Sequence, residues 1–201
     1  MQHKDAELYL KAADKKLKPI IERVGACALS FTKRNRFDVL ANSIIGQQLS
    51  VKAARTIKNR VYELLGDHKN LEAEHFTNIE IPQLRGCGLS NAKASYILRL
   101  AKNSINGTLD LNSLHKHTDD EILNVLTQQK GVGSWTAEMF MIFALGRPDI
   151  LSTTDAGLLR SAQSIYKTKE KPTAKEFTHI AEKWKPYRSI ASWYLWRYLD
   201  A

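Results

Sequence analysis

Apolar residues recur at helical spacing along the whole chain, and no segment shows the strict alternation of a half-buried strand. Residues 119–126 place apolar side chains on one helical face, and residues 135–145 are apolar on nearly every side, as in a buried helix. We therefore predict an all-α protein. The predicted helices cover residues 5–14, 18–28, 36–46, 50–65, 81–85, 90–103, 119–128, 134–145, 156–165, 173–183 and 187–199.

Two of these helices are joined by a very short connector that contains Gly131 and Gly133. Thr118 and Glu121 have the spacing of a capping box, which begins the first helix. Glycine permits the backbone angles of a tight turn. The pattern predicts a helix-hairpin-helix unit over about residues 118–146.

The start of the second helix in this unit is a candidate anion site. The first backbone N–H groups of a helix lack intrahelical partners and carry partial positive charge, so phosphates bind there. Lys130 adds a full charge beside the turn. A Gly-x-Gly sequence is also found in plain connectors, so the turn alone does not decide between the two interpretations.

Composition favours a polyanionic partner. The 201 residues include 30 Lys and Arg against 21 Asp and Glu, a formal charge of +9, and such a balance is typical of proteins that bind nucleic acid. No apolar stretch approaches the about 18 residues of a membrane span, and two cysteines are too few for a disulfide scaffold. We expect one soluble, intracellular domain over residues 1–201, without an independent linker.

A second Gly-x-Gly sequence, Gly86-Cys87-Gly88, precedes Ser90 and resembles the first. It could form another backbone-amide site for phosphate. The better supported interpretation is a glycine-capped helix end followed by an N-cap at Ser90.

Several separated motifs together resemble the helix-hairpin-helix DNA glycosylases, and within them the alkylpurine (3-methyladenine) DNA glycosylases in a minimal, all-helical form. The resemblance implies two closely packed helical lobes with the active-site cleft between them. The motifs run from about residue 36 to the end in the order of the family. They are IIGQQLS with KAA (44–50 and 52–54), LRGCGLS with KA (84–90 and 93–94), KGVGSWTAEMF (130–140), the loop from RPD (147–149) to Asp155, and WKPYRS with WYLW (184–189 and 193–196).

The resemblance implies a monofunctional enzyme that flips alkylated purines such as 3-methyladenine and 7-methylguanine out of double-stranded DNA and hydrolyses the N-glycosidic bond. Asp155 matches the catalytic aspartate, whose carboxylate stabilises an oxocarbenium-like sugar and orients water. The residue type alone is equally typical of a helix N-cap. The neighbouring acid, Asp149, is better explained as a turn partner of Arg147.

Bifunctional relatives carry a nucleophilic lysine where this chain has Trp135. Without that amine no Schiff base forms, so strand cleavage is not expected. Two alternatives stay open: a non-catalytic DNA-binding protein on the same scaffold, and a glycosylase for other damaged bases.

The resemblance also assigns binding residues. Those expected to contact the damaged base are Trp135, Met139, Tyr194 and Trp196. Those expected to contact DNA are Gln47, Gln48 and Leu49, with Gln48 as the inserted wedge, together with Lys130, Gly131, Val132, Gly133, Ser134 and Thr136. Backbone carbonyls of Thr127, Gln129 and Val132 are a candidate site for a monovalent cation, Na⁺ or K⁺. No cofactor is required, and the protein is expected to act as a monomer in the cytoplasm, nucleoid or nucleus.

Overall fold

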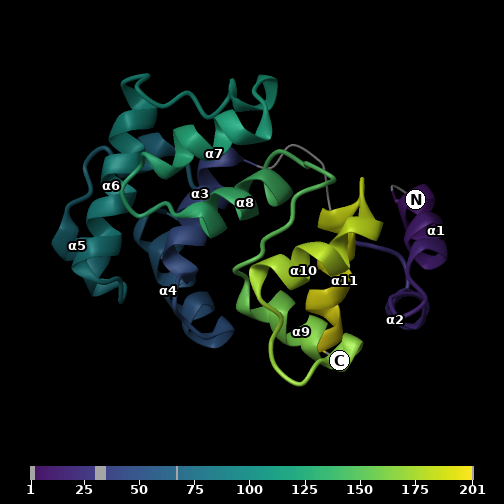
Figure 1. The fold of residues 1–201 in the computed structure, drawn as a ribbon. Coiled ribbons are helices and arrows are strands. Elements are labelled where there is room, and N and C mark those ends of the chain that lie inside the picture. The colour runs from purple at the N-terminus through teal and green to yellow at the C-terminus, as the bar shows by residue number, and fades with distance from the viewer. Residues whose placement is uncertain (1–2, 30–34, 67, 201) are drawn as a thin grey trace. The chain divides into compact units, whose positions relative to one another are not determined.

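The computed structural model describes residues 3–29, 35–66 and 68–200. Every regular element within these ranges is a helix (Figure 1), which confirms the prediction of an all-α fold. None of these helices is long and apolar enough to cross a membrane. The α-helices are α1 (Lys4–Ala13), α2 (Lys18–Val24), α3 (Arg36–Gly46), α4 (Val51–Leu64), α5 (Ile81–Gly86), α6 (Asn91–Ile105), α7 (Asp119–Thr127), α8 (Ser134–Phe143), α9 (Ala156–Tyr166), α10 (Ala174–Ala181) and α11 (Arg188–Asp200), and the short 3-10 helices are η1 (Ala73–Phe76), η2 (Leu114–Lys116) and η3 (Glu182–Trp184).

The helix boundaries differ from the sequence prediction at a few places. Helix α2 ends at Val24, four residues earlier than expected, because Gly25 has a positive φ of 81° and terminates the helix. The predicted helix over 173–183 divides into α10 and the 3-10 turn η3. The 3-10 helices η1 and η2 were not predicted, since each spans only four or three residues and shows too little periodicity.

The chain forms two compact units, each described by itself. The terminal unit combines residues 1–31 with 146–201, and the central unit covers residues 32–145. In the terminal unit α11 packs against α9, α2 and α1. In the central unit α8 packs against α3 and α7, and α6 packs against α3, α5 and η1. The near absence of polar positions on α8, foreseen from the sequence, corresponds to six buried residues out of ten.

A buried carboxylate links distant segments of the terminal unit. Asp14 is only 1% exposed, and its Oδ2 accepts hydrogen bonds from Trp184 Nε1 at 2.8 Å and from the Tyr166 hydroxyl. Lys183 Nζ lies 3.2 Å from the same oxygen. Burial raises the pKa of Asp14, but the hydrogen bonds and the nearby cation outweigh burial and leave the pKa below its ordinary value.

Candidate active site and nucleic-acid interface

The hairpin of the central unit is built as its sequence predicts. The Thr118 hydroxyl accepts from the Glu121 amide at 3.3 Å, the Glu121 carboxylate accepts from the Thr118 amide at 2.8 Å, and α7 then runs to Thr127. After a six-residue connection, α8 begins at Ser134. Gly133 at its N-cap supplies no side-chain cap, and the first intrahelical bond of α8 runs from the Ala137 amide to the Gly133 carbonyl. The start of α8 therefore retains the amide arrangement that binds anions.

The two hairpin glycines serve different purposes. Gly131 has a φ of 86°, and a Cβ there would lie 2.2 Å from Cδ2 of Tyr96 on α6, so both the turn and the packing require glycine. Gly133 has ordinary extended angles, with φ −90° and ψ 177°, contrary to our expectation that both glycines serve the turn. A Cβ at Gly133 would meet no atom within 4 Å. Gly133 is exposed, as are Lys130 and Ser134, so an external group can approach this backbone closely.

The loop between α3 and α4 is bonded to the hairpin through Gln47. Its Nε2 donates to the Gly131 carbonyl at 2.9 Å and to Thr136 Oγ1 at 3.0 Å. The side chain of Gln47 is therefore engaged within the protein. Thr136 is only 2% exposed, so its side chain is an internal anchor, and its predicted contact with DNA stays a prediction.

Gln48 and Leu49 form the exposed tip of this loop. Gln48 adopts the left-handed conformation, with φ 56°, and is exposed. Leu49 is 38% exposed. The following residue, Ser50, caps α4 by accepting from the Ala53 amide at 3.2 Å. This geometry leaves Gln48 and Leu49 as the available insertion residues, and Gln48 stays the predicted wedge.

The role of Lys93 was not predicted, although the residue lies in the KA motif at 93–94. Lys93 Nζ donates to the Ile45 carbonyl at 2.9 Å and to the Gln47 carbonyl at 2.6 Å, and so caps the last turn of α3. Burial lowers the pKa of Lys93. The motif KA at 93–94 carried the signal, but only the fold shows which carbonyls the lysine reaches.

The second Gly-x-Gly segment is a helix end, as the better supported interpretation held. Gly88 follows α5 with a positive φ of 104°, and Ser90 caps α6 by accepting from the Lys93 amide at 3.2 Å. Cys87 between the glycines is buried, and its thiol donates to the Arg60 carbonyl at 3.4 Å. Nothing in this geometry presents a second open row of amides.

Asp155 in the terminal unit is held by two donors. Its Oδ1 accepts from the Leu158 amide at 2.8 Å, which makes it the N-cap of α9, and from Trp196 Nε1 at 3.2 Å. The residue is 8% exposed. A Cβ at Gly157 would lie 3.0 Å from the same oxygen, so the small residue leaves room for the carboxylate. The capping role is confirmed, and it fixes the orientation of the carboxylate.

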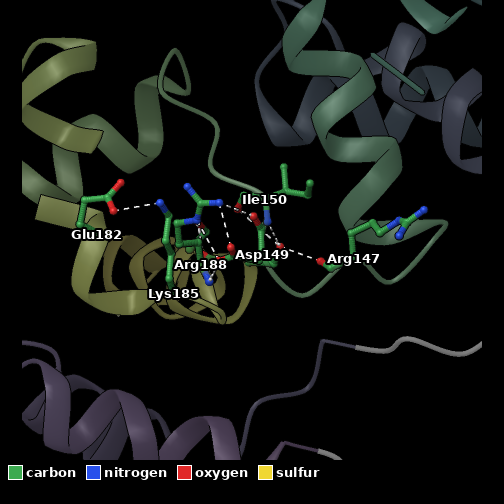
Figure 2. A network of polar contacts seen from close by, with 8 residues as sticks. Arg147, Asp149, Ile150, Glu182, Lys185 and Arg188 are labelled. Carbon is green, nitrogen blue, oxygen red and sulfur yellow. Dashed lines mark hydrogen bonds and ion pairs between the residues drawn. The ribbon is translucent and has the colours of Figure 1, made fainter. Parts of the chain in front are cut away.

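The loop that leads from α8 to Asp155 is anchored to the start of α11 (Figure 2). Arg188 Nε donates to Asp149 Oδ1 and Arg188 Nη2 to Asp149 Oδ2, each at 2.8 Å. Ser189 Oγ donates to the Arg147 carbonyl at 2.7 Å and accepts from the Ile150 amide at 2.9 Å. Asp149 is a turn partner, as expected, but the structure pairs it with Arg188, whereas we predicted Arg147.

The four residues expected to contact the base have different environments. Trp135 on α8 and Trp196 on α11 are partly exposed, whereas Met139 is 5% exposed. Tyr194 is fully buried, and its hydroxyl donates to Glu7 Oε1 at 3.1 Å and to the Gly25 carbonyl at 2.9 Å. Burial and the Glu7 carboxylate raise the pKa of Tyr194 well above its ordinary value. Tyr194 is a core residue of the terminal unit, which does not favour contact with the base, and that role stays a prediction.

The hairpin carbonyls are the predicted site for a monovalent cation. Gln129 O accepts from the Val132 amide at 3.0 Å and retains a second lone pair. The described residues hold no group of three His, Cys, Asp or Glu able to bind a metal ion. The cation site at the carbonyls of Thr127, Gln129 and Val132 stays a prediction.

Comparisons with known proteins agree with one another. The family model described as "HhH-GPD superfamily base excision DNA repair protein" matches residues 41–186. The chain is 30% identical over 198 residues to the alkylbase DNA glycosidase-like protein mag2 of Schizosaccharomyces pombe, covering 97% of this chain and 93% of that one. A structure of S. pombe 3-methyladenine DNA glycosylase Mag1 in complex with abasic DNA superposes with a TM-score of 0.90, at 26% identity over 98% of this chain and 97% of that one. The crystal structure of a DNA-3-methyladenine glycosidase from Bacillus halodurans gives a TM-score of 0.78, at 38% identity over 94% and 86% of the two chains.

Proposed function

Because this chain belongs to the HhH-GPD superfamily of base excision DNA repair proteins, we propose that it is a DNA glycosylase for alkylated purines. It flips the damaged nucleotide out of double-stranded DNA and hydrolyses the N-glycosidic bond, leaving an abasic site. The relatives named above as alkylbase glycosidase-like or 3-methyladenine proteins support 3-methyladenine as a substrate, and 7-methylguanine is proposed because it is another cationic alkylpurine. The protein acts as a monomer inside the cell, on DNA.

One observation carries this proposal: the carboxylate of Asp155 is held in one orientation by the Leu158 amide and the Trp196 indole. Cleavage of a purine from its sugar develops positive charge at C1′. A preorganised carboxylate stabilises that charge and orients the attacking water without reorganising during the reaction. An alkylated purine is already cationic and leaves readily, so one acid suffices.

The hairpin binds the DNA backbone. The amides of Gly133 and Ser134 at the start of α8 receive a phosphate, and Lys130 adds charge beside it. The carbonyls of Thr127, Gln129 and Val132 hold a monovalent cation, which supplies positive charge near the same phosphate. Gln48, with Leu49 beside it, fills the space left by the flipped nucleotide.

Base recognition depends on aromatic surfaces. In the central unit, the ring face of Trp135 attracts a cationic base more strongly than its neutral parent. In the terminal unit, the Trp196 indole orients Asp155. Met139 is 5% exposed, so little of its side chain is available to contact the base. The protein then selects a damaged base by its positive charge and makes few hydrogen bonds to it.

The proposed enzyme lacks lyase activity, because Trp135 occupies the position where bifunctional relatives carry the nucleophilic lysine. Incubation with lesion-containing duplex should leave abasic sites that break only after alkali is added. Borohydride should trap no protein–DNA adduct.

The direct test is base release from genomic DNA methylated by a simple alkylating agent, with chromatography of the free bases. We expect wild-type protein to release 3-methyladenine and 7-methylguanine. Asp155→Asn keeps an N-cap oxygen but removes the charge, and it should lower the rate by at least about a hundredfold with DNA affinity retained. Firm DNA binding without base release by the wild type would instead support the non-catalytic binder, and release of other damaged bases would move the substrate class.

A further inference from the structure

The insertion loop, defined as residues 46–50, is bonded to two other parts of the central unit. Gln47 bridges from this loop to the hairpin, where its amide reaches the Gly131 carbonyl and the Thr136 hydroxyl. Lys93 on α6 donates to the carbonyls of Ile45 and Gln47 at the start of the loop. The loop is thus tied at one residue through both its side chain and its backbone.

The hairpin itself rests on α6. The ring of Tyr96 fills the space that a side chain at position 131 would need, and Asn103 Nδ2 donates to Gln129 Oε1 at 2.9 Å. Lys93, Tyr96 and Asn103 are spaced three and seven residues apart, so they share one face of this helix. Helix α6 therefore supports both the insertion loop and the phosphate-binding turn.

The strength of these contacts differs from that of surface contacts. Lys93 is partly buried, and its ammonium loses water to meet two carbonyls at 2.9 Å or less. Charge-assisted bonds of this kind are about twice as strong as neutral ones. Gln48, directly after the anchored residue, stays exposed in a left-handed conformation, which is unfavourable for a side-chain-bearing residue. Lys93 and Gln47 hold the backbone that directly precedes this turn.

We infer that Lys93 and Gln47 are positioning residues, which couple phosphate capture at the hairpin to insertion of Gln48. This inference rests on the proposed function, since it takes Gln48 as the residue that enters the duplex. While both side chains keep their hydrogen bonds, the hairpin that binds the DNA backbone fixes the position of Gln48 relative to the base stack. If either side chain cannot donate, the hairpin still binds phosphate, but Gln48 is no longer aligned with the space left by the flipped nucleotide.

Duplex DNA with a tetrahydrofuran abasic analogue opposite 2-aminopurine reports insertion, because 2-aminopurine fluorescence rises when its stacking is disturbed. We expect the wild type to raise the signal at saturation. Lys93→Met and Gln47→Met keep side-chain length without donors and should reduce the rise by about threefold or more, while the affinity of Lys93→Met for undamaged duplex stays within about twofold. Lys93→Arg retains donors for both carbonyls and should restore most of the signal.

A double-mutant cycle separates coupling from general damage. In a Gln48→Ala background, Gln47→Met should cause no further loss of the fluorescence rise, because both changes act through the same side chain. Additive losses, unchanged fluorescence in the single variants, or no fluorescence rise with the wild type would each overturn the inference. Thermal melts identify a variant that fails to fold. If Gln47→Met fails to fold, Gln47→Glu replaces it, because a carboxylate cannot donate to the Gly131 carbonyl. Lys93→Arg stays the variant that retains its donors. The readout needs no base release, so failure of the proposed enzymatic function is recognised separately, by intact alkylated bases in the chromatographic assay.

Discussion

At the scale of single residues, the described structure separates positions that look alike in the sequence. Gly131 and Gly133 lie two apart in one motif, yet only Gly131 needs a positive φ and lacks room for a side chain. Asp149 and Asp155 lie in one loop, yet Asp149 is a bidentate partner of Arg188 and Asp155 a capping carboxylate. The proposed roles of Gly133 and Asp155 therefore follow from their own geometry, which differs from that of Gly131 and Asp149.

The two hairpin glycines give a matched pair of variants. Gly131→Ala should lower the free energy of unfolding by about 2–4 kcal/mol, since a Cβ enters the Tyr96 ring and the backbone is left-handed. Gly133→Ala should change stability by less than about 0.5 kcal/mol. Urea unfolding of the two variants measures the difference.

Replacing Gly133 with a larger residue should weaken DNA binding and leave the fold intact. Gly133→Leu places a side chain over the amides of α8 and should weaken binding to duplexes of every sequence by about tenfold or more, as loss of a charge-assisted hydrogen bond does. Fluorescence anisotropy at fixed salt measures this. Unchanged affinity with a native melting curve would remove the hairpin from DNA binding.

Asp14 predicts a pH dependence of stability. Its folded-state pKa is lowered from the ordinary 3.8, so its contribution to stability is present above that value and is lost as the pH falls through the folded pKa. Asp14→Asn should cost about 2–3 kcal/mol at neutral pH. The difference between wild type and variant should shrink below about pH 4 in urea melts. A difference that stays constant on acidification would mean that the carboxylate charge is not what stabilises the cluster.

At the scale of elements, the loop between α8 and α9 positions Asp155 at the start of α9. Arg188 and Ser189 at the start of α11 bind residues 147–150 by side chain and backbone (Figure 2). A loop anchored in this way holds the following helix start, and hence the capped carboxylate, in place.

Breaking the Asp149–Arg188 pair should therefore reduce turnover more than binding. We expect Asp149→Asn to lower kcat for base release by about tenfold, while KM for DNA changes little, because a small misplacement of a catalytic group is costly. Glu182→Gln removes the exposed ion pair with Lys185 shown in the same figure and should have no effect. Equal losses in both variants would point to general destabilisation.

Local signals predicted most of the α-helices and their starts, because capping chemistry lies within a few residues. Thr118 with Glu121, Ser50, Ser90 and Asp155 all cap the helices that their sequence context suggests. The bonds of Lys93, Gln47 and Asp14 join residues 46 to 170 apart, and no local pattern encodes such partners. The burial of Tyr194 could not be predicted for the same reason, since an aromatic residue in a helix is equally suited to a core and to a pocket.

At the scale of the whole molecule, a formal charge of +9 predicts binding that depends strongly on salt. If about four phosphates are neutralised, the binding constant should fall by about a hundredfold between about 50 and about 200 mM salt, following counterion release. Titrations of one undamaged duplex at several salt concentrations measure the slope. A flat response would contradict an interface dominated by phosphate contacts.

The division of the chain into units also has a temporal side. The central unit is one continuous segment, whereas the terminal unit needs both ends of the chain. Asp14 emerges early from the ribosome, but its partner Trp184 is synthesised 170 residues later. During synthesis the central unit, with its hairpin and insertion loop, is therefore complete while α1 and α2 still lack their core. The unit that contains the proposed phosphate-binding hairpin is therefore synthesised as one continuous segment, whereas the unit that contains Asp155 can form its core only after α11 has been made.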